Sequence, residues 1–153
     1  MKKYTLLNNV TGWISFVIAA VVYLLTIEPT VSFWDCGEFI TTSFKLEVGH
    51  PPGAPLFMIL GRFFTLFADA AGAAKMVNIM SALASGFTIM FLFWTITHLA
   101  KKLLASEGKI STGQTFAIIA SGFTGAMAYA FSDTFWFSAV EGEVYATSSL
   151  ITA

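Results

Sequence analysis

Three uncharged and largely apolar runs dominate the chain, at residues 4–27, 76–100 and 110–132. A transmembrane helix needs about 20 mostly apolar residues, so these runs predict three helical spans, over about 8–27, 77–99 and 112–131. The last residues, YATSSLITA, look like the start of a further span near residue 145 and contain no stop signal. We therefore expect an all-α integral membrane protein, of which residues 1–153 form the N-terminal part.

A fourth apolar stretch, residues 55–71, is shorter and carries Arg62 near its middle and Asp69 near its end. A charge at the centre of a span costs roughly 2.5–3.5 kcal/mol even on the lenient insertion scale. By composition alone this stretch is either a true span or a helix that lies in the membrane interface.

The lysines decide between these two possibilities. Lys2 and Lys3 precede the first run, and the loop between the last two runs contains Lys101, Lys102 and Lys109. Both clusters belong in the cytoplasm, which requires an even number of crossings between them. Residues 55–71 then do not cross, and we predict an interfacial or re-entrant helix in the first outer loop. A secretory signal peptide is the competing interpretation of the N-terminus, but the apolar run is long and lacks a convincing cleavage site.

The overall composition supports a chain that lies largely in lipid. Charged residues make up 11% of the sequence, against about 25% in soluble domains. The formal net charge is −1 and no basic cluster is of the kind that neutralises nucleic-acid phosphates, so we expect no nucleic-acid partner. The single cysteine, Cys36, excludes an internal disulfide and, by the same count, any cysteine-based zinc site.

The predicted topology places almost all the acidic residues on one side of the membrane. The outer loops span residues 28–76 and 132–144, and only Glu107 stays inside. The outer acidic residues are Glu28, Asp35, Glu38, Glu47, Asp69, Asp133, Glu141 and Glu143.

The first outer loop predicts a short helix that presents two carboxylates. Ser32 can cap a helix that begins at Phe33 or Trp34, on which Asp35 and Glu38 share a face. Gly49 would end this helix, and the rigid turn His-Pro-Pro-Gly follows at residues 50–53.

The apolar neighbours of Asp35 and Glu38 make them candidate functional groups. Trp34, Cys36, Phe39 and Ile40 surround them in the sequence, a setting in which a carboxylate tends to have a function. For Glu28, Glu47 and Asp69 we expect ordinary solvated carboxylates.

The second outer segment has a similar pattern. Aromatic residues at 135–137 are typical of the interfacial belt, and Glu141, Glu143 and Tyr145 follow where the next helix begins. Both acidic loops lie on the same side, so their carboxylates could converge on one pocket, which the sequence cannot decide.

Three motifs in this order, WDCGEF, GHPPGAPLF and AVEGEVYA, resemble a family of O-mannosyltransferase-like membrane proteins within the GT-C glycosyltransferase superfamily. The resemblance implies a GT-C-like multi-span helical bundle. It also implies transfer of a sugar, typically mannose, from a polyprenyl-phosphate carrier to a Ser or Thr hydroxyl of an acceptor protein on the outer or lumenal side. A carboxylate of the first loop is the base in the relatives, and Asp35 matches its position. The mannosyltransferases have Asp and Glu adjacent, whereas Cys36 and Gly37 separate Asp35 from Glu38 here.

The chemistry of this transfer suggests roles for the other polar residues. A positioned carboxylate that accepts the proton of the hydroxyl is worth roughly 10²–10⁴-fold in rate, and the departing lipid phosphate needs a cation or donors. His50 and Arg62 are the candidates for the phosphate, and Glu141, Glu143 and Tyr145 are further substrate-binding candidates. The mannosyltransferase branch works without a metal, so we expect no cofactor, although the carboxylates could hold a divalent ion.

Two other function classes remain open. A transporter or flippase-type protein would use the outer acidic residues to bind ions or a lipid-linked substrate, but such groups usually lie within the spans. Here the long apolar runs contain no acid or base except His98. A non-enzymatic assembly subunit is the other alternative. We expect a multi-pass protein of the bacterial inner membrane with a cytoplasmic N-terminus.

Overall fold

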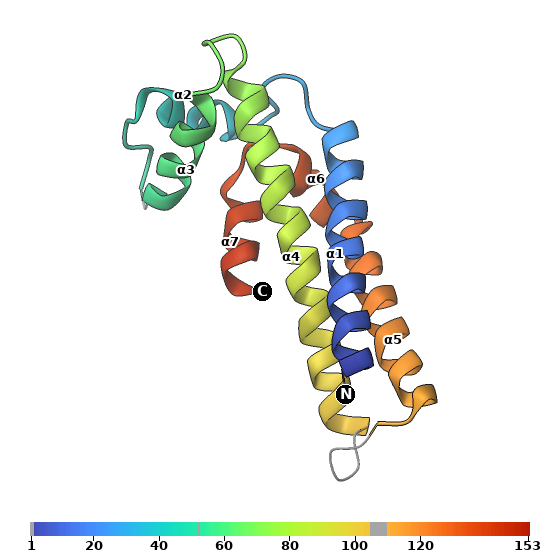
Figure 1. Cartoon of the computed structure of the whole chain (residues 1–153). Helices are drawn as coiled ribbons and strands as arrows, with labels where there is room; N and C mark the ends of the chain where they lie inside the picture. The colour runs from blue at the N-terminus through green and yellow to red at the C-terminus, as the bar shows by residue number, and fades with distance from the viewer. Residues whose placement is uncertain (1, 52, 105–109) are drawn as a thin grey trace.

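The computed structural model describes residues 2–51, 53–104 and 110–153. This part of the chain is entirely helical, as predicted (Figure 1). Its seven helices are α1 (Lys2–Leu25), α2 (Cys36–Lys45), α3 (Pro55–Thr65), α4 (Ala73–Leu104), α5 (Thr112–Ala130), α6 (Asp133–Val140) and α7 (Val144–Thr152).

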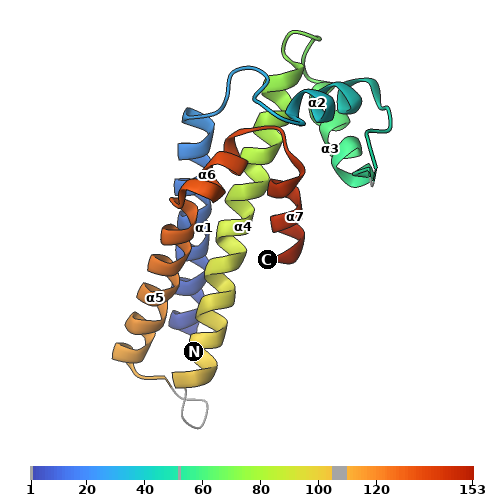
Figure 2. The same ribbon diagram turned by 180° about the vertical axis from the view of Figure 1, so that it is seen from behind.

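The helix α4 is the centre of the fold, and every other helix contacts it (Figures 1 and 2). It has 32 residues, which at 1.5 Å per residue gives about 48 Å. Helices α1 and α5 run alongside it, while α2 and α3 project from one end.

Two of the helices are long and apolar enough to cross a membrane, Lys3–Leu25 and Ala73–Leu104. A third candidate span consists of α5 and α6, which are bent by 66° relative to each other. The segment 132–144, expected to be a loop, therefore contains the helix α6. This corrects the sequence interpretation, in which the aromatic residues of this segment were assigned only to the interfacial belt.

Small residues let the three long helices approach closely. The face of α4 that meets α1 includes Gly86, where an added Cβ would lie 3.1 Å from Ala20 and 3.2 Å from the Phe16 ring. On the side of α5, a Cβ at Gly122 would lie 2.4 Å from Thr97. Close approach through small residues is the usual way helices associate in lipid, where no hydrophobic effect drives them together.

The two ends of the bundle differ in charge. At one end the Lys101 ammonium lies over the Tyr4 ring, 4.9 Å from its centre, so the two basic clusters of α1 and α4 are at the same end. At the other end, the Glu28 N–H donates to the Val140 carbonyl at 3.1 Å, which joins the two acidic segments. The antiparallel pairing of α1 and α4 thus agrees with the even number of crossings inferred from the lysines.

The first outer segment forms a helical hairpin, α2 followed by α3, which packs on α4. The helix α3 has 11 residues, about 16 Å in length, against a hydrocarbon core of about 30 Å. It is therefore too short to cross a membrane by itself, and its location in the interface stays a prediction.

The boundaries of α2 differ from those expected. The helix begins at Cys36, with Asp35 and not Ser32 at the N-cap, because Trp34 adopts a positive φ of 60° that is incompatible with a helix. It ends at Lys45 rather than at Gly49, because Leu46 adopts a left-handed conformation. The Glu47 N–H then donates to the Thr42 carbonyl at 2.8 Å, which closes the helix.

The contact between α4 and α5 predicts that Gly122 tolerates no side chain. Gly122→Ala would place a methyl group 2.4 Å from Thr97 and 3.1 Å from Phe93, and overpacking of this kind costs about 1–3 kcal/mol. We expect a lower midpoint of thermal unfolding in detergent for this variant. Gly113→Ala in the same helix is the matched control, since its Cβ meets only Ser111, at 4.0 Å. Equal stability of the two variants would contradict the packing of α5 on α4.

Candidate functional site

A cavity of about 480 Å³ lies where the α2–α3 hairpin meets the start of α7. One part of its lining is apolar and includes Phe39, Leu56, Phe57, Val144 and Ile151. The other part is polar and comprises Asp35, His50, Glu143, Tyr145, Thr147 and Ser148. The two outer segments, far apart in the sequence, therefore share one cavity, which answers the question that the sequence left open.

Asp35 lines this cavity from the N-cap of α2. Its side chain is exposed and makes no capping hydrogen bond to the helix. A carboxylate at this position normally accepts a hydrogen bond from the first turn. The geometry therefore leaves the Asp35 carboxylate available to a ligand in the cavity.

Glu38 is bound to His50. One oxygen of its carboxylate accepts the His50 backbone N–H at 2.6 Å, and the other lies 2.9 Å from the ring Nδ1. The hydrogen bond from the His50 side chain lowers the pKa of Glu38, and the same bond raises the pKa of His50. Glu38 is not among the residues that line the cavity, so its contacts are those of a residue that positions His50.

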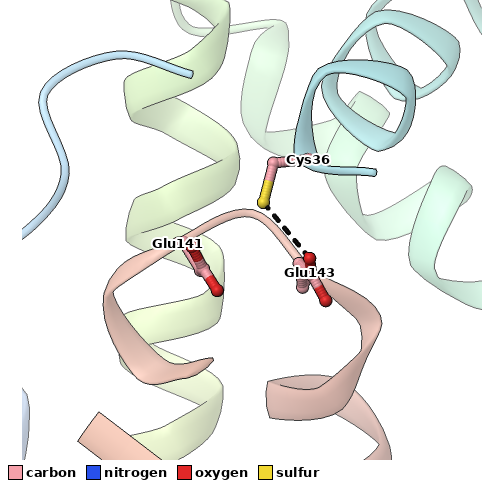
Figure 3. A group of neighbouring side chains, drawn as sticks. All are labelled: Cys36, Glu141 and Glu143. Atoms are coloured by element: carbon pink, nitrogen blue, oxygen red, sulfur yellow. Dashed lines mark hydrogen bonds between the residues drawn. The ribbon is translucent and has the colours of Figure 1, made fainter. Parts of the chain in front are cut away.

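Glu141 and Glu143 lie on the connection between α6 and α7 and are buried, with 6% and 8% of their surfaces exposed. The thiol of Cys36, which is fully buried, donates to Glu143 Oε1 at 3.5 Å (Figure 3). Burial raises the pKa of the Glu143 carboxyl and that of the Cys36 thiol. Glu143 lines the cavity, whereas Glu141 does not.

Arg62 and Tyr145 occupy different settings. Tyr145 is exposed and lines the cavity. Arg62 does not line it; its guanidinium donates to the Phe44 carbonyl and lies 5.6 Å from the centre of the Phe44 ring. These contacts tie α3 to α2, so the structure gives Arg62 a packing role, and its role in phosphate binding stays a prediction.

Two features of the site were missed in the sequence. Thr147 and Ser148 line the cavity from α7, and the spacing of Thr147 from Glu143, one helical turn, could have indicated it. Cys36, Glu141 and Glu143 also form a group whose potential ligand atoms lie within 4.8 Å of one another. The prediction that a single cysteine excludes a cysteine-containing metal site was therefore too strict, because one thiol can lie beside carboxylates that are distant in the sequence.

A family model described as the protein O-mannosyl-transferase TMEM260 N-terminal domain matches residues 35–153. The chain belongs to this family. The match begins at Asp35 and includes all the residues of the cavity.

Two curated relatives carry the same name. The protein O-mannosyl-transferase tmem260 of Dictyostelium discoideum is 25% identical over 140 residues, which cover 90% of this chain and 15% of the relative. The protein O-mannosyl-transferase TMEM260 of Mus musculus is 28% identical over 135 residues, covering 88% and 17% respectively. The chain thus corresponds to about one sixth of the length of these TMEM260 relatives. No solved structure matches the chain.

The pairing of Glu38 with His50 predicts a raised pKa for the histidine. The pKa of His50 should lie above its ordinary value of 6.5, and Glu38→Gln should bring it back toward that value because the carboxylate is lost. The measurement is NMR titration of the ring of labelled histidine, with the His50 signal identified by its loss in His50→Gln. Glu47→Gln, an exposed neighbour in the same loop, should leave the titration unchanged.

The same pair sets a pH window for the order of the loop. The raised pKa of His50 gives stabilisation that is present below 6.5 and lost as the pH rises through the folded-state value. The lowered pKa of Glu38 gives stabilisation that is present above 4.5 and lost as the pH falls. The contact is therefore strongest between these two values. An unchanged His50 titration in Glu38→Gln would show that the contact is absent in solution.

Proposed function

We propose that this chain is the N-terminal part of a GT-C membrane glycosyltransferase. In this proposal the enzyme transfers a sugar, most simply mannose, from a polyprenyl-phosphate carrier to a Ser or Thr hydroxyl of an acceptor protein. Membership of the TMEM260 family supports the reaction class. The observation that carries the proposal is the cavity, which combines an available carboxylate with an apolar wall.

Asp35 is the proposed general base. A Ser or Thr hydroxyl is a weak nucleophile near neutral pH, and a carboxylate that takes its proton as it attacks the anomeric carbon accelerates transfer by roughly 10²–10⁴-fold. The support lies in the geometry: the Asp35 side chain is exposed, faces the cavity and does not cap its own helix.

His50 is the proposed partner of the lipid phosphate that leaves. Negative charge builds up on this group during transfer and is stabilised by a positioned cation or donor. Since the Glu38 carboxylate raises the pKa of His50, a larger fraction of this imidazole is protonated near neutral pH. Glu38 thus acts through His50, and the apolar residues Leu56, Phe57 and Ile151 offer a surface for the first isoprene units.

The transport alternative has less support. It requires acidic or basic groups inside the spans, whereas residues 4–25 of α1 and 112–130 of α5 contain no Asp, Glu, His, Lys or Arg, and His98 is the one such residue at 76–100 of α4. Asp35, His50 and Glu143 lie instead at one end of the bundle, where they line the cavity.

The assignment of the base predicts the behaviour of Asp35→Asn. The substitution keeps the size of the side chain but removes its ability to take a proton, so turnover should fall by roughly 10²–10⁴-fold with little change in donor affinity. The measurement is transfer from polyprenyl-phosphate mannose to a peptide by the purified full-length protein. Asp69→Asn, the same change at an exposed site away from the cavity, should transfer normally. Near-normal turnover of a well-folded Asp35→Asn protein would end the assignment.

If transfer takes place on the outer side of the membrane, the cavity must face outward and the lysine clusters must face the cytoplasm. In a cysteine-free background, a membrane-impermeant maleimide should label cysteines at positions 69 and 133 in intact cells. Cysteines at positions 3 and 111 should react only after permeabilisation, because positive clusters stay in the cytoplasm. Labelling of only one of positions 3 and 111 from outside would mean that an odd number of spans separates them, so that residues 55–71 cross the membrane, and would contradict the proposed topology.

A further inference from the structure

Cys36, Glu141 and Glu143 form a compact acidic group outside the role assigned to Asp35. One ligand atom from each lies within 4.8 Å of the others, and all three residues are buried. The cysteine comes from the first turn of α2 and the glutamates from the connection between α6 and α7, with the thiol directed at Glu143 (Figure 3). Three acidic groups from two distant segments are thus gathered in one place.

The described part of the chain supplies no positive charge to this group. The ion pair found among the described residues, His50 with Glu38, does not include Glu141 or Glu143. Buried carboxylates are normally paired with a cation or bound to a metal, because the loss of their hydration is costly. The arrangement therefore lacks a positively charged partner.

Asn78 gives an independent indication of a ligand. It is 1% exposed, and its amide nitrogen donates to the Glu28 and Thr30 carbonyls at 2.8 and 3.0 Å. These two bonds fix the amide so that Oδ1 faces Gly142, lying 2.9 Å from where a Cβ there would be. This oxygen has no hydrogen-bond partner, and it is aimed at the segment between the two glutamates.

Thr147 is a second buried polar side chain near this group without a hydrogen-bond partner. It is 5% exposed, and its hydroxyl has no partner. It lies four residues after Glu143, which is the N-cap of α7, and both residues line the cavity. Buried hydroxyl and amide oxygens without partners are uncommon and call for an explanation. Near Cys36, Glu141 and Glu143, the buried oxygen atoms that can accept a hydrogen bond or bind a cation therefore outnumber the groups that donate to them.

We propose that Cys36, Glu141 and Glu143 bind one divalent cation of the Zn²⁺ class. Thiolate and carboxylate ligands together suit Zn²⁺, whereas Ca²⁺ and Mg²⁺ take oxygen ligands. Tetrahedral Zn²⁺ with bonds of about 2.0–2.3 Å places its ligand atoms about 3.5 Å apart. Cys36 Sγ and Glu143 Oε1 are already 3.5 Å apart. All the ligand atoms lie within 4.8 Å of one another, so the third needs to approach by no more than about 1 Å.

Binding replaces the proton of the Cys36 thiol, which passes to solvent. The cation offsets two of the three negative charges that its ligands then carry, and it joins the first turn of α2 to the α6–α7 connection. Since Cys36 follows Asp35 directly, the same contact fixes one wall of the cavity. The site is independent of the proposed transfer reaction, because it rests on buried ligands and not on a substrate.

Cobalt is the spectroscopic probe for this site, because Co²⁺ bound to a thiolate gives a charge-transfer absorption band. The purified full-length protein is stripped with a chelator and titrated with Co²⁺ and then with Zn²⁺, which should displace it. We expect one equivalent of bound Co²⁺ with a thiolate band, and a rise in the midpoint of thermal unfolding on addition of Zn²⁺.

Three variants locate the cation. Cys36→Ser should abolish the thiolate band, and Glu141→Gln should weaken binding of Zn²⁺ by at least about 10-fold. Glu47→Gln, an exposed carboxylate of the first outer loop, should bind like the unmodified protein. If Glu141→Gln does not fold, Cys36→Ser, which changes one atom, decides the outcome by itself.

The inference is overturned if the unmodified protein shows no thiolate band with Co²⁺, or if Cys36→Ser retains the same band. It is also overturned if Zn²⁺ stabilises Cys36→Ser and the unmodified protein equally. These readouts do not depend on activity. Loss of sugar transfer with intact metal binding would count against the proposed function alone.

Discussion

The buried side chain of Asn78 joins the three segments on which the candidate site depends. From near the start of α4 it donates to the carbonyls of Glu28 and Thr30, just after α1, and it packs against Gly142 between α6 and α7. Backbone groups at this depth need internal partners, since each unmade hydrogen bond to a buried group costs about 1–3 kcal/mol. Because α4 carries Asn78, the helix sets the position of both outer segments at once. A side chain at Gly142 would disturb this contact, because its Cβ would also press on Val77 and Ile40.

The acidic residues of this end of the bundle fall into three environments that favour different chemistry. Asp35 is exposed and free of capping contacts, which suits a group that exchanges a proton with a substrate. Glu38 is held by His50. Glu141 and Glu143 are buried beside a thiol, where a charge requires either a proton or a cation. Environment rather than residue type therefore separates the proposed roles, as in other sites with several carboxylates.

The apolar and polar parts of the cavity also have separate origins. The helix α3 contributes only apolar residues to the lining, Leu56 and Phe57 among them, while the polar groups come from the N-cap of α2, the α2–α3 connection and the first half of α7. A substrate that is itself half lipid and half sugar phosphate matches this division. The short helix α3 contributes to it because it returns along α2 and does not continue through the bundle.

The sequence by itself determined the all-helical class and the two long apolar helices, and it singled out Asp35 as a candidate, because apolar length and an acidic residue in an apolar context are local properties. The pairing of basic ends was also predictable, since the positive-inside rule uses only the order of charges along the chain. The limits of α2 were not predictable, because they depend on the positive φ of Trp34 and on Leu46, which no residue preference requires. The proximity of Cys36 to Glu143 and the pairing of Glu38 with His50 were decided only by the tertiary structure. Contacts between residues 107 positions apart follow from how α4 packs against its neighbours, and packing depends on all the side chains together rather than on any local pattern.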